Sequence, residues 1–445
     1  MSLMEKMSAL RGGGEAEQKK VDLHEKITDA IAPTLDVDLL RSPDQANRDR
    51  IIREKITEAA LQITTQEGIN LSKQQFESLV SDVLAGIVGF GPLERLLRDK
   101  EISEIMTKGA KCIFVEKKGK VVKSEVTFKD EAELRDIVER IMKPLGRVCD
   151  DQVPYQDARL PDGSRVNVVI PPLAIDGTAL TIRKFSKNRL THHDLIKFGA
   201  MTPEMAEFLR ACVEVRLNII VSGGTGSGKT TLLNVLSSFI PEDERTVTIE
   251  DAAELSFAQE HVIRLETRPA DFEGKGAITI RDMVKNALRM RPDRIVIGEC
   301  RGPEAFDMLQ AMNTGHDGSM STLHSNAPQD AIGRIETLVM MAGYDLPVKA
   351  IRKQISSAVN LIIQQSRLVD GSRKVTYITE VQGMEGESIL MQDIFIFEQE
   401  GMGPDGKLIG KLKPTGLVPK FYERFKAEGV AIDQSIFHTP ADGKK

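Results

Sequence analysis

The chain has 445 residues, a formal net charge of −6 at pH 7 and a pI near 5.8, and this length predicts two or three domains rather than one core. The acidic balance argues against a dedicated nucleic-acid-binding protein, whose surface normally carries a basic excess, so we expect no nucleic-acid partner. The longest apolar runs are strand-sized and the charged N-terminus lacks a signal-peptide core, so we expect a cytoplasmic protein without a membrane span.

The first 69 residues predict a tail and a small helical module. Residues 1–20 are polar and rich in glycine, a composition that cannot bury enough apolar surface to become ordered, so we expect a flexible tail. From 21 to 69 apolar residues recur at helical spacing, as in Leu23, Ile27 and Ile31. Residues 21–69 therefore read as a small helical module.

Residues 70–190 alternate between helical and strand-like segments, which predicts an α+β domain. A helix opens after Ser72 and ends at the loop signal 89–92. We expect a second helix at 131–142, strands at 113–115, 121–122, 126–128, 165–170 and 179–182, and a linker at 186–191. The four cysteines, Cys112, Cys149, Cys212 and Cys300, form no CxxC pair, and we expect buried free thiols.

Residues 191–445 begin with a phosphate-binding pattern, in which the apolar run 217–221 leads into GGTGSGKT and then into a helical pattern. Glycines let the backbone wrap a phosphate chain closely with its N–H groups, Lys229 adds a positive charge for the β- and γ-phosphates, and the Thr230 hydroxyl is placed to bind Mg²⁺. We therefore expect ATP and Mg²⁺ as cofactors. The expected phosphate-binding residues are Gly223, Gly224, Thr225, Gly226, Ser227, Gly228, Lys229, Thr230 and Thr231.

After this loop, strand-like segments recur with helices between them, which indicates a mostly parallel sheet in an α/β fold, with ligands at the carboxyl ends of the strands. The expected strands are 245–249, 262–265, 294–298, 319–323, 361–363, 375–377 and 394–397.

Two acidic positions follow strands of this sheet and are candidates for hydrolytic chemistry. Glu299 ends the apolar run 294–298, where a P-loop enzyme needs a group that orders Mg²⁺ or polarises the attacking water. Glu254 lies in the segment TIEDAAE, supported by Glu250 and Asp251, and serves the same chemistry or Mg²⁺ positioning. An acidic helix start is the alternative for that segment.

Two histidines, His316 and His324, lie in GHDGSMSTLH. No third histidine or cysteine is near and no HExxH spacing occurs, so a metal site built on them is improbable. A histidine at the end of a strand can instead hydrogen-bond the terminal phosphate and lose that bond on hydrolysis. A purely structural role is the alternative.

The order GGTGSGKTT, TIEDAAEL, RIVIGECRGPEA and GHDGSMSTLHSN resembles the Walker A, Asp box, Walker B and His box of secretion-superfamily traffic ATPases. The stretches LETRPADFEGKGAITIRDMVKNALRMRPDRI and QQSRLVDGSRKVTYITEVQGMEGESILMQDIFIFE resemble the CpaF family, the motors of Tad/Flp-type and related type IV pili. The resemblance covers most of the chain from about residue 70. A tetracysteine module found in type II secretion ATPases has no counterpart here.

The resemblance implies a homohexameric ring in which a RecA-like domain holds each nucleotide and the α+β domain covers it, with hydrolysis moving the domains as rigid bodies. It assigns Glu254 and Glu299 to the hydrolytic water and Mg²⁺, alongside Thr230, and His324 to the His-box sensor. Gly298 stands where many P-loop enzymes carry a metal-binding aspartate, a feature that the superfamily shares. The family also uses arginines to reach phosphates, and the matching positions here are Arg159, Arg165, Arg183, Arg264 and Arg268.

The function implied is a cytoplasmic ATPase that drives pilus assembly and associates with the inner membrane through platform proteins. The helical module at 21–69 either packs on the ring or docks onto such a platform protein. A nucleotide-gated scaffold with little hydrolysis, an ATPase of a type IV secretion system and a DNA-translocating motor are the other functions considered, the last disfavoured by the acidic charge.

Overall fold

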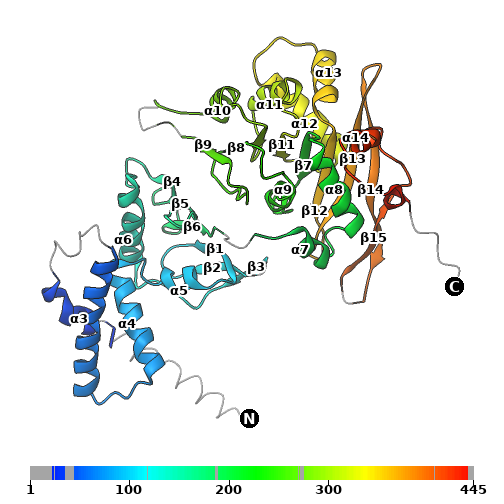
Figure 1. Cartoon of the computed structure of the whole chain (residues 1–445). Coiled ribbons are helices and arrows are strands. Elements are labelled where there is room, and N and C mark those ends of the chain that lie inside the picture. The colour runs from blue at the N-terminus through cyan, green and yellow to red at the C-terminus, as the bar shows by residue number, and fades with distance from the viewer. Residues whose placement is uncertain are drawn as a thin grey trace. The chain divides into compact units, whose positions relative to one another are not determined.

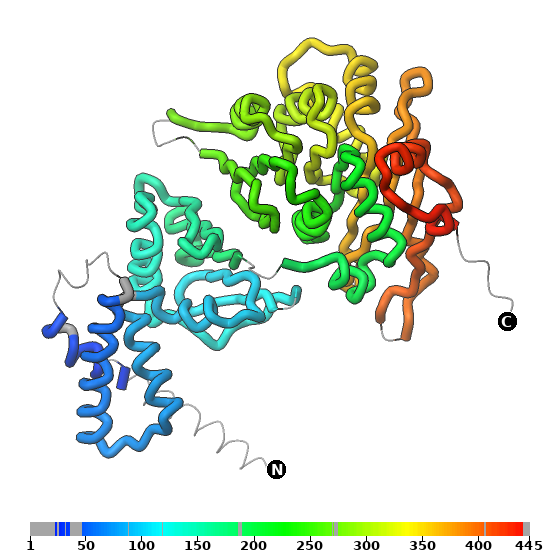
Figure 2. Tube along the Cα trace, viewed as in Figure 1, coloured from blue at the N-terminus to red at the C-terminus, as the bar shows by residue number. Residues whose placement is uncertain are grey.

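The computed structural model describes residues 23–24, 26–35, 45–117, 119–185, 189–268, 270, 275–404 and 406–438. The tail expected at 1–20 lies outside these residues, as does the part 186–188 of the expected linker. The chain divides into two compact units, residues 1–186 and 187–445 (Figures 1 and 2).

The first unit begins with a helical hairpin of α3 (Gln45–Gln66) and α4 (Lys73–Val88), after the short η1 (Ala32–Thr34). A capping box starts α4, because the Ser72 hydroxyl accepts from the Gln75 N–H and the Gln75 side chain accepts from the Ser72 N–H. Buried residues of both helices form one apolar cluster, so the core of the helical module continues beyond residue 69 into α4. Figure 2 shows the two helices side by side in blue.

An antiparallel six-stranded sheet with the order β3-β2-β1-β6-β5-β4 follows. Its elements are α5 (Leu93–Arg98), β1 (Ile102–Thr107), β2 (Ile113–Lys117), β3 (Lys120–Lys123), α6 (Glu131–Met142), η2 (Lys143–Leu145), β4 (Tyr155–Arg159), β5 (Arg165–Val169) and β6 (Ala179–Arg183). Apolar residues of α6, including Leu134 and Ile137, pack on one face of the sheet. Arg140 of α6 donates to the carbonyls of Gly86 and Gly89, which ties the helical hairpin to the sheet.

The strand expected at 126–128 is wrong. The Val126 N–H donates to the Ser124 hydroxyl, which closes a turn, and the Phe128 N–H donates to the Ala110 carbonyl. Phe128 is buried in the core from this loop. The sequence shows only an apolar pair there, and the local turn takes the N–H that a strand would have used.

The second unit holds a nine-stranded sheet with the order β15-β14-β13-β12-β7-β11-β10-β8-β9. Strands from β9 to β12 pair in parallel, and β13, β14 and β15 continue the sheet in antiparallel pairing. The strands are β7 (Ile219–Gly223), β8 (Thr246–Glu250), β9 (Val262–Glu266), β10 (Arg294–Ile297), β11 (Met320–Leu323), β12 (Leu361–Arg367), β13 (Arg373–Glu385), β14 (Ser388–Met402) and β15 (Leu408–Pro414).

Helices cover both faces of this sheet (Figure 1), because side chains that alternate along each strand feed two apolar clusters. Ile219 and Val221 of β7 join one cluster, and Ile220 joins the other. The helices are α7 (His192–Lys197), α8 (Pro203–Glu214), α9 (Lys229–Ser237), α10 (Ile280–Ala287), α11 (Glu304–Asn313), α12 (Pro328–Met340), α13 (Val348–Ala358), α14 (Tyr422–Ala427) and η3 (Gln434–Phe437). The expected α/β fold with a preceding α+β domain is confirmed.

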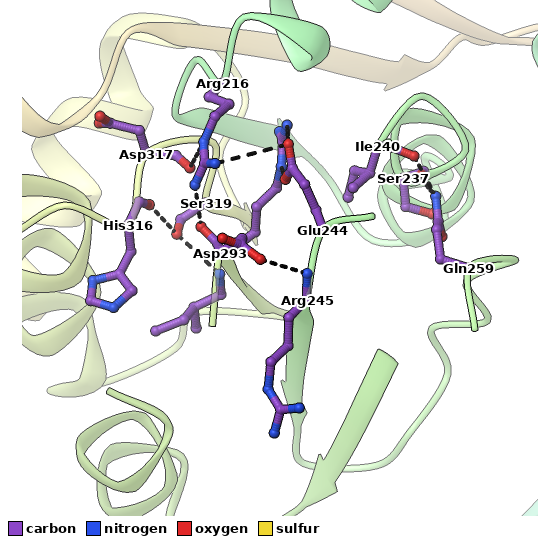
Figure 3. A network of polar contacts seen from close by, with 12 residues as sticks. Arg216, Ser237, Ile240, Glu244, Arg245, Gln259, Asp293, His316, Asp317 and Ser319 are labelled. Carbon is purple, nitrogen blue, oxygen red and sulfur yellow. Dashed lines mark hydrogen bonds and ion pairs between the residues drawn. The ribbon is translucent and has the colours of Figure 1, made fainter. Parts of the chain in front are cut away.

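A polar network holds the amino ends of the parallel strands, opposite the ends that carry the nucleotide motifs (Figure 3). Arg294 is fully buried and its guanidinium pairs with the Glu244 carboxylate, with Nη2 2.9 Å from Oε1. Arg216 donates to the Asp293 carbonyl at 2.7 Å, and the Arg245 N–H donates to the Asp293 carboxylate at 2.7 Å. These contacts fix the strand starts relative to one another.

Two further expectations concern thiols and membranes. All four cysteines are free, but only Cys212 and Cys300 are buried, while Cys112 and Cys149 are half-buried, so the expectation of burial holds for two of them. Within the described parts of the chain, no helix is both long and apolar enough to cross a bilayer.

Candidate functional site

The phosphate loop joins the buried strand β7 to α9, as the sequence predicts. Gly226 and Gly228 have φ angles of 70° and 100°, in the left-handed region where glycine is favoured. The Ser227 N–H and the Lys229 ammonium both donate to the Gly224 carbonyl, at 3.3 and 3.1 Å. Two donors therefore converge on a single oxygen inside the loop.

Glu299 and His324 meet beside Lys229. His324 Nε2 lies 2.7 Å from Glu299 Oε1 and 3.5 Å from the Lys229 ammonium. Arg301 holds the other carboxylate oxygen, Oε2, at 2.5 Å. The structure thus brings together the loop lysine, the carboxylate two residues after β10 and the histidine directly after β11. Lys229 and Glu299 are 70 positions apart in the chain (299 − 229), and Glu299 and His324 are 25 apart (324 − 299).

Burial lowers the pKa values of both nitrogen bases in this group. Desolvation is the main cause for His324, with the Lys229 charge second, and the Glu299 carboxylate opposes them. The Lys229 pKa is also lowered chiefly by burial, against the attraction of Glu299. Near neutral pH His324 is therefore an uncharged imidazole. Because the Lys229 ammonium can only donate, Nε2 accepts from it when the ring carries its proton on Nδ1.

The loop after β8 carries the other predicted carboxylates, and they are not equivalent. Glu250 is buried, and its Oε2 accepts from the N–H groups of Glu254 and Leu255 at 2.8 and 2.9 Å. Burial raises the Glu250 pKa to about 7. Glu254 is half-buried, and the charges of Glu254 and Asp251 both act on Arg301. Glu250 shapes the loop, whereas Glu254 and Asp251 face the arginine that also holds Glu299.

Two acceptors hold the rest of this loop in place. The Ala253 N–H donates to Glu266 Oε2 at 3.1 Å, and the Ser256 N–H donates to Asn234 Oδ1 of α9 at 2.9 Å. The loop that carries Glu254 is thereby tied to the helix that follows the phosphate loop.

Several positions near the site were missed by the sequence reasoning. Glu304 accepts from the N–H groups of Arg301 and Gly302, at 2.6 and 2.7 Å, and so fixes the turn after Glu299. The Ser222 and Ser325 hydroxyls hydrogen-bond to one another, which links β7 to the residue after His324. Arg373 contacts the phosphate loop from β13. Glu304 follows a loop–helix boundary in the sequence, a signal that could have identified it, whereas the other contacts join distant segments.

The predicted arginines occupy two separate places. Arg159, Arg165 and Arg183 lie in one row across β4, β5 and β6, since Arg159 pairs with Arg165 and Arg165 with Arg183. Opposite residues in antiparallel strands share a face of the sheet. In the second unit, Arg264 lies on β9 in register with Thr248, and its charge acts on Glu250. Arg268 donates to the Gly276 carbonyl at 2.7 Å.

A family model described as "Type II/IV secretion system protein" matches residues 87–393, a span that holds the phosphate loop, Glu254, Glu299 and His324. The chain belongs to this family. The membership in the secretion superfamily that the motifs predict is thereby confirmed.

Individual relatives carry names from secretion and conjugation. A putative conjugal transfer protein of Mycobacterium tuberculosis is 34% identical over 333 residues, which cover 73% of this chain and 93% of that protein. A type IV secretion system protein, a PtlH homologue of Bordetella bronchiseptica, is 35% identical over 54% of this chain and 79% of that protein. The VirB11 ATPase of the Brucella suis type IV secretion system, solved with sulphate, is 28% identical over 64% of this chain and 94% of that chain, with a TM-score of 0.36.

Proposed function

We propose that this secretion-family protein is a Mg²⁺-dependent ATPase that converts hydrolysis into domain motion. The observation that carries the proposal is the chain of contacts from Lys229 through His324 to Glu299 and Arg301, beside a loop with left-handed glycines. A structural glycine turn needs none of these charged partners. A hydrolytic site needs a cation at the phosphates and a carboxylate near the attacking water, and these contacts place both beside the loop.

The residues fit a nucleoside triphosphate. Ser227 is 1% exposed, and its hydroxyl has no hydrogen-bond partner within the described residues, while its N–H and Lys229 already converge on one oxygen. No group of three or more His, Cys, Asp or Glu side chains in the described part of the chain is arranged to hold a metal ion. That fits Mg²⁺, which is usually held by few protein ligands together with substrate phosphates.

When bound, Mg²⁺ neutralises phosphate charge and orders the attacking water, and Thr230, Glu254 and Glu299 are the proposed residues around it. The Lys229 ammonium binds the β- and γ-phosphates, with the N–H groups of Gly223 to Thr231 around them. Glu299 accepts the proton of the attacking water; Arg301 holds its Oε2, and its Oε1 lies 2.7 Å from His324 Nε2. His324 senses the terminal phosphate through its contact with Lys229.

Arginines complete the proposed site. Arg264 on β9 and Arg268, two residues after that strand, supply positive charge in the second unit, and the family resemblance also assigns Arg159, Arg165 and Arg183 to phosphates. Guanidinium groups suit this role because they bind two phosphate oxygens at once and stay charged. In a homohexameric ring, part of this set comes from a neighbouring subunit.

We assign the motor to a type IV pilus of the Tad/Flp kind, working at the cytoplasmic side of the inner membrane with platform proteins as partners. The support is the resemblance of the two long stretches at 265–295 and 364–398 to the CpaF family. A second candidate, an ATPase of a type IV secretion or conjugation system, is favoured by the names of the relatives above. Deletion of the gene separates them, because the first predicts loss of pili and the second predicts loss of secretion or transfer with pili intact.

Phosphate release with Mg²⁺ and ATP tests the enzymatic part, with Lys229→Ala and Glu299→Gln compared against the exposed control Glu423→Gln. We expect turnover to vanish in Lys229→Ala, and to fall by about 10²–10⁴-fold in Glu299→Gln while ATP binding persists. A wild-type rate equal to that of Lys229→Ala would contradict hydrolysis. Intact function of Glu299→Gln in cells would indicate a nucleotide-gated scaffold instead of a motor.

A further inference from the structure

The hairpin formed by β12 and β13 extends past the end of β7, beside the phosphate loop. Gln365 of β12 is in register with Gly223, the last residue of β7, so Ser366 and Arg367 continue beyond the point where β7 gives way to the loop. Arg367 and Arg373 stand opposite one another on the two strands of the hairpin. Two guanidinium side chains are therefore presented at the same height next to the loop.

Both arginines approach the loop closely. Arg373 Nε donates to the Gly226 carbonyl at 2.8 Å. A Cβ placed on Gly228 would lie 3.4 Å from Arg373 Cδ, and a Cβ placed on Gly226 would lie 3.8 Å from Arg367 Nη1. The glycines of the loop thus leave room for side chains of the hairpin as well as for phosphates.

A buried amide next to these contacts has unused hydrogen-bonding capacity. Gln365 is 2% exposed, its Oε1 has no partner among the described residues, and its Nε2 would lie 3.2 Å from a Cβ on Gly228. A buried polar atom without a partner is costly, so its persistence marks a place where a ligand or an ordered water completes the bonding.

Hydrogen bonds to neighbouring segments fix the β12–β13 hairpin in place beside the phosphate loop. Asp370 accepts from the Ser372 N–H and hydroxyl and from the Leu408 N–H, which closes the turn and ties it to β15. These bonds lower the Asp370 pKa to about 2, with the Ser372 hydroxyl as the largest cause. On the next residue after Arg373, the Lys374 ammonium donates to the Gly199 carbonyl at 2.8 Å.

The strand order indicates on which side of β7 each end of a bound nucleotide lies. β11 and β10, which deliver His324 and Glu299, lie on one side of β7, and β12 lies on the other. The terminal phosphate belongs beside Lys229, His324 and Glu299, so the α-phosphate and nucleoside leave toward the hairpin side. This step rests on the proposed ATPase function.

We propose that the β12–β13 hairpin forms the nucleoside side of the site, in which Arg373 positions the phosphate loop and Arg367 contacts the ribose or base. The peptide between residues 226 and 227 is trans, so its carbonyl and N–H point in opposite directions. By holding the Gly226 carbonyl outward, Arg373 turns the Ser227 N–H into the loop, where it donates to Gly224. Arg367 offers a planar cation that can donate to ribose oxygens or stack on a base.

Equilibrium binding of fluorescent mant-ADP to the full-length protein, with inorganic pyrophosphate as a competitor, separates the two roles. Arg373→Ala should weaken both ligands about tenfold, because it acts on the loop itself. Arg367→Ala should weaken mant-ADP about tenfold and leave pyrophosphate within twofold, because pyrophosphate has no nucleoside. Arg373→Lys should remain weakened, since an ammonium cannot replace the Nε donor in its place.

The half-buried Arg424→Ala, on α14, is the control and should bind both ligands as the wild type does, with unchanged thermal melting in every variant. The proposal is overturned if Arg373→Ala leaves both affinities within twofold, if Arg373→Lys restores binding fully, or if Arg367→Ala affects both ligands equally or neither. Lys229→Ala reports on the proposed function independently: wild-type mant-ADP affinity in that variant would refute the nucleotide site as a whole.

Discussion

The side chain of Glu250 covers Gly298, so closely that a Cβ at position 298 would lie 2.6 Å from Glu250 Cγ. Gly298 follows β10, where its N–H donates to the Ile249 carbonyl and its own carbonyl accepts from the Thr322 hydroxyl at 2.7 Å. The position where many P-loop enzymes carry an aspartate is therefore occupied here by a side chain from the neighbouring strand. Glycine is needed at position 298 because the Glu250 side chain occupies the space that a Cβ would take.

Replacing Gly298 by alanine should destabilise the protein by about 1–3 kcal/mol, because the added methyl group must displace a buried carboxylate or shift two strands. Gly333 in α12 is the matched control: a Cβ there meets nothing within 4 Å. Gly333→Ala should leave the protein equally stable or slightly more stable. Urea denaturation of both variants measures the difference, and equal stabilities would contradict the packing role.

Glu250 should make stability depend on pH in the absence of nucleotide and Mg²⁺. Its pKa is raised to about 7 in the folded protein, mainly by burial, against an ordinary value of 4.5. The folded state therefore binds a proton that the unfolded state releases, and the stabilising contribution falls as pH rises from about 4.5 to about 7. The loss reaches about 3 kcal/mol at most.

Glu250→Gln tests this dependence, because the amide oxygen still accepts from the Glu254 and Leu255 N–H groups and carries no charge at any pH. Denaturation curves at pH 5 and pH 8 should differ less for the variant than for the wild type. An identical pH dependence in both proteins would show that another group causes it.

Protonation of His324 should cause the fall in the rate of ATP turnover at acidic pH. Its pKa lies below the ordinary value, so it is neutral near pH 7 and becomes protonated on acidification. A protonated ring is repelled by Lys229 and can no longer accept its hydrogen bond, which disturbs the contact between His324 and the loop lysine. His324→Gln keeps an N–H donor and should retain turnover within about tenfold while flattening the acid limb, whereas His324→Ala should lose about 10²-fold. Profiles of kcat against pH check this, and an unchanged acid limb in His324→Gln would rule it out.

Removing one partner of the buried pair Arg294 and Glu244 should lower the stability of the protein strongly, whereas replacing both by apolar residues should lower it little. Glu244→Ala leaves the fully buried Arg294 guanidinium without its carboxylate, which should cost about 3–5 kcal/mol of stability. The double variant Glu244→Leu with Arg294→Met removes both charges and should recover most of that loss. Chemical denaturation compares them, and a cost below about 1 kcal/mol for Glu244→Ala would mean that the pair contributes little.

Much of the fold was predictable from short-range patterns. The phosphate loop, its flanking strand and helix, and the strands β8, β10 and β11 that lead to Glu250, Glu299 and His324 are encoded by apolar runs followed by glycine or polar residues. The misplaced strand at 126–128 shows the limit of such patterns, because one hydroxyl at Ser124 was enough to turn the chain. The β1 and β4 strands carry too little alternation to be recognised.

The sequence by itself determined that this chain has a phosphate loop, two acidic positions and a histidine that follow strands, because these depend on residues that are neighbours in the chain. Only the tertiary structure decided which of them meet: Glu299 joins His324 and Arg301, Glu250 turns inward over Gly298, and Arg373 reaches Gly226 across 147 positions. The physical reason is strand order. β12, β7, β11, β10 and β8 lie side by side in the sheet although they are far apart in the chain, and strand order depends on the packing of the whole sheet rather than on any local run of residues.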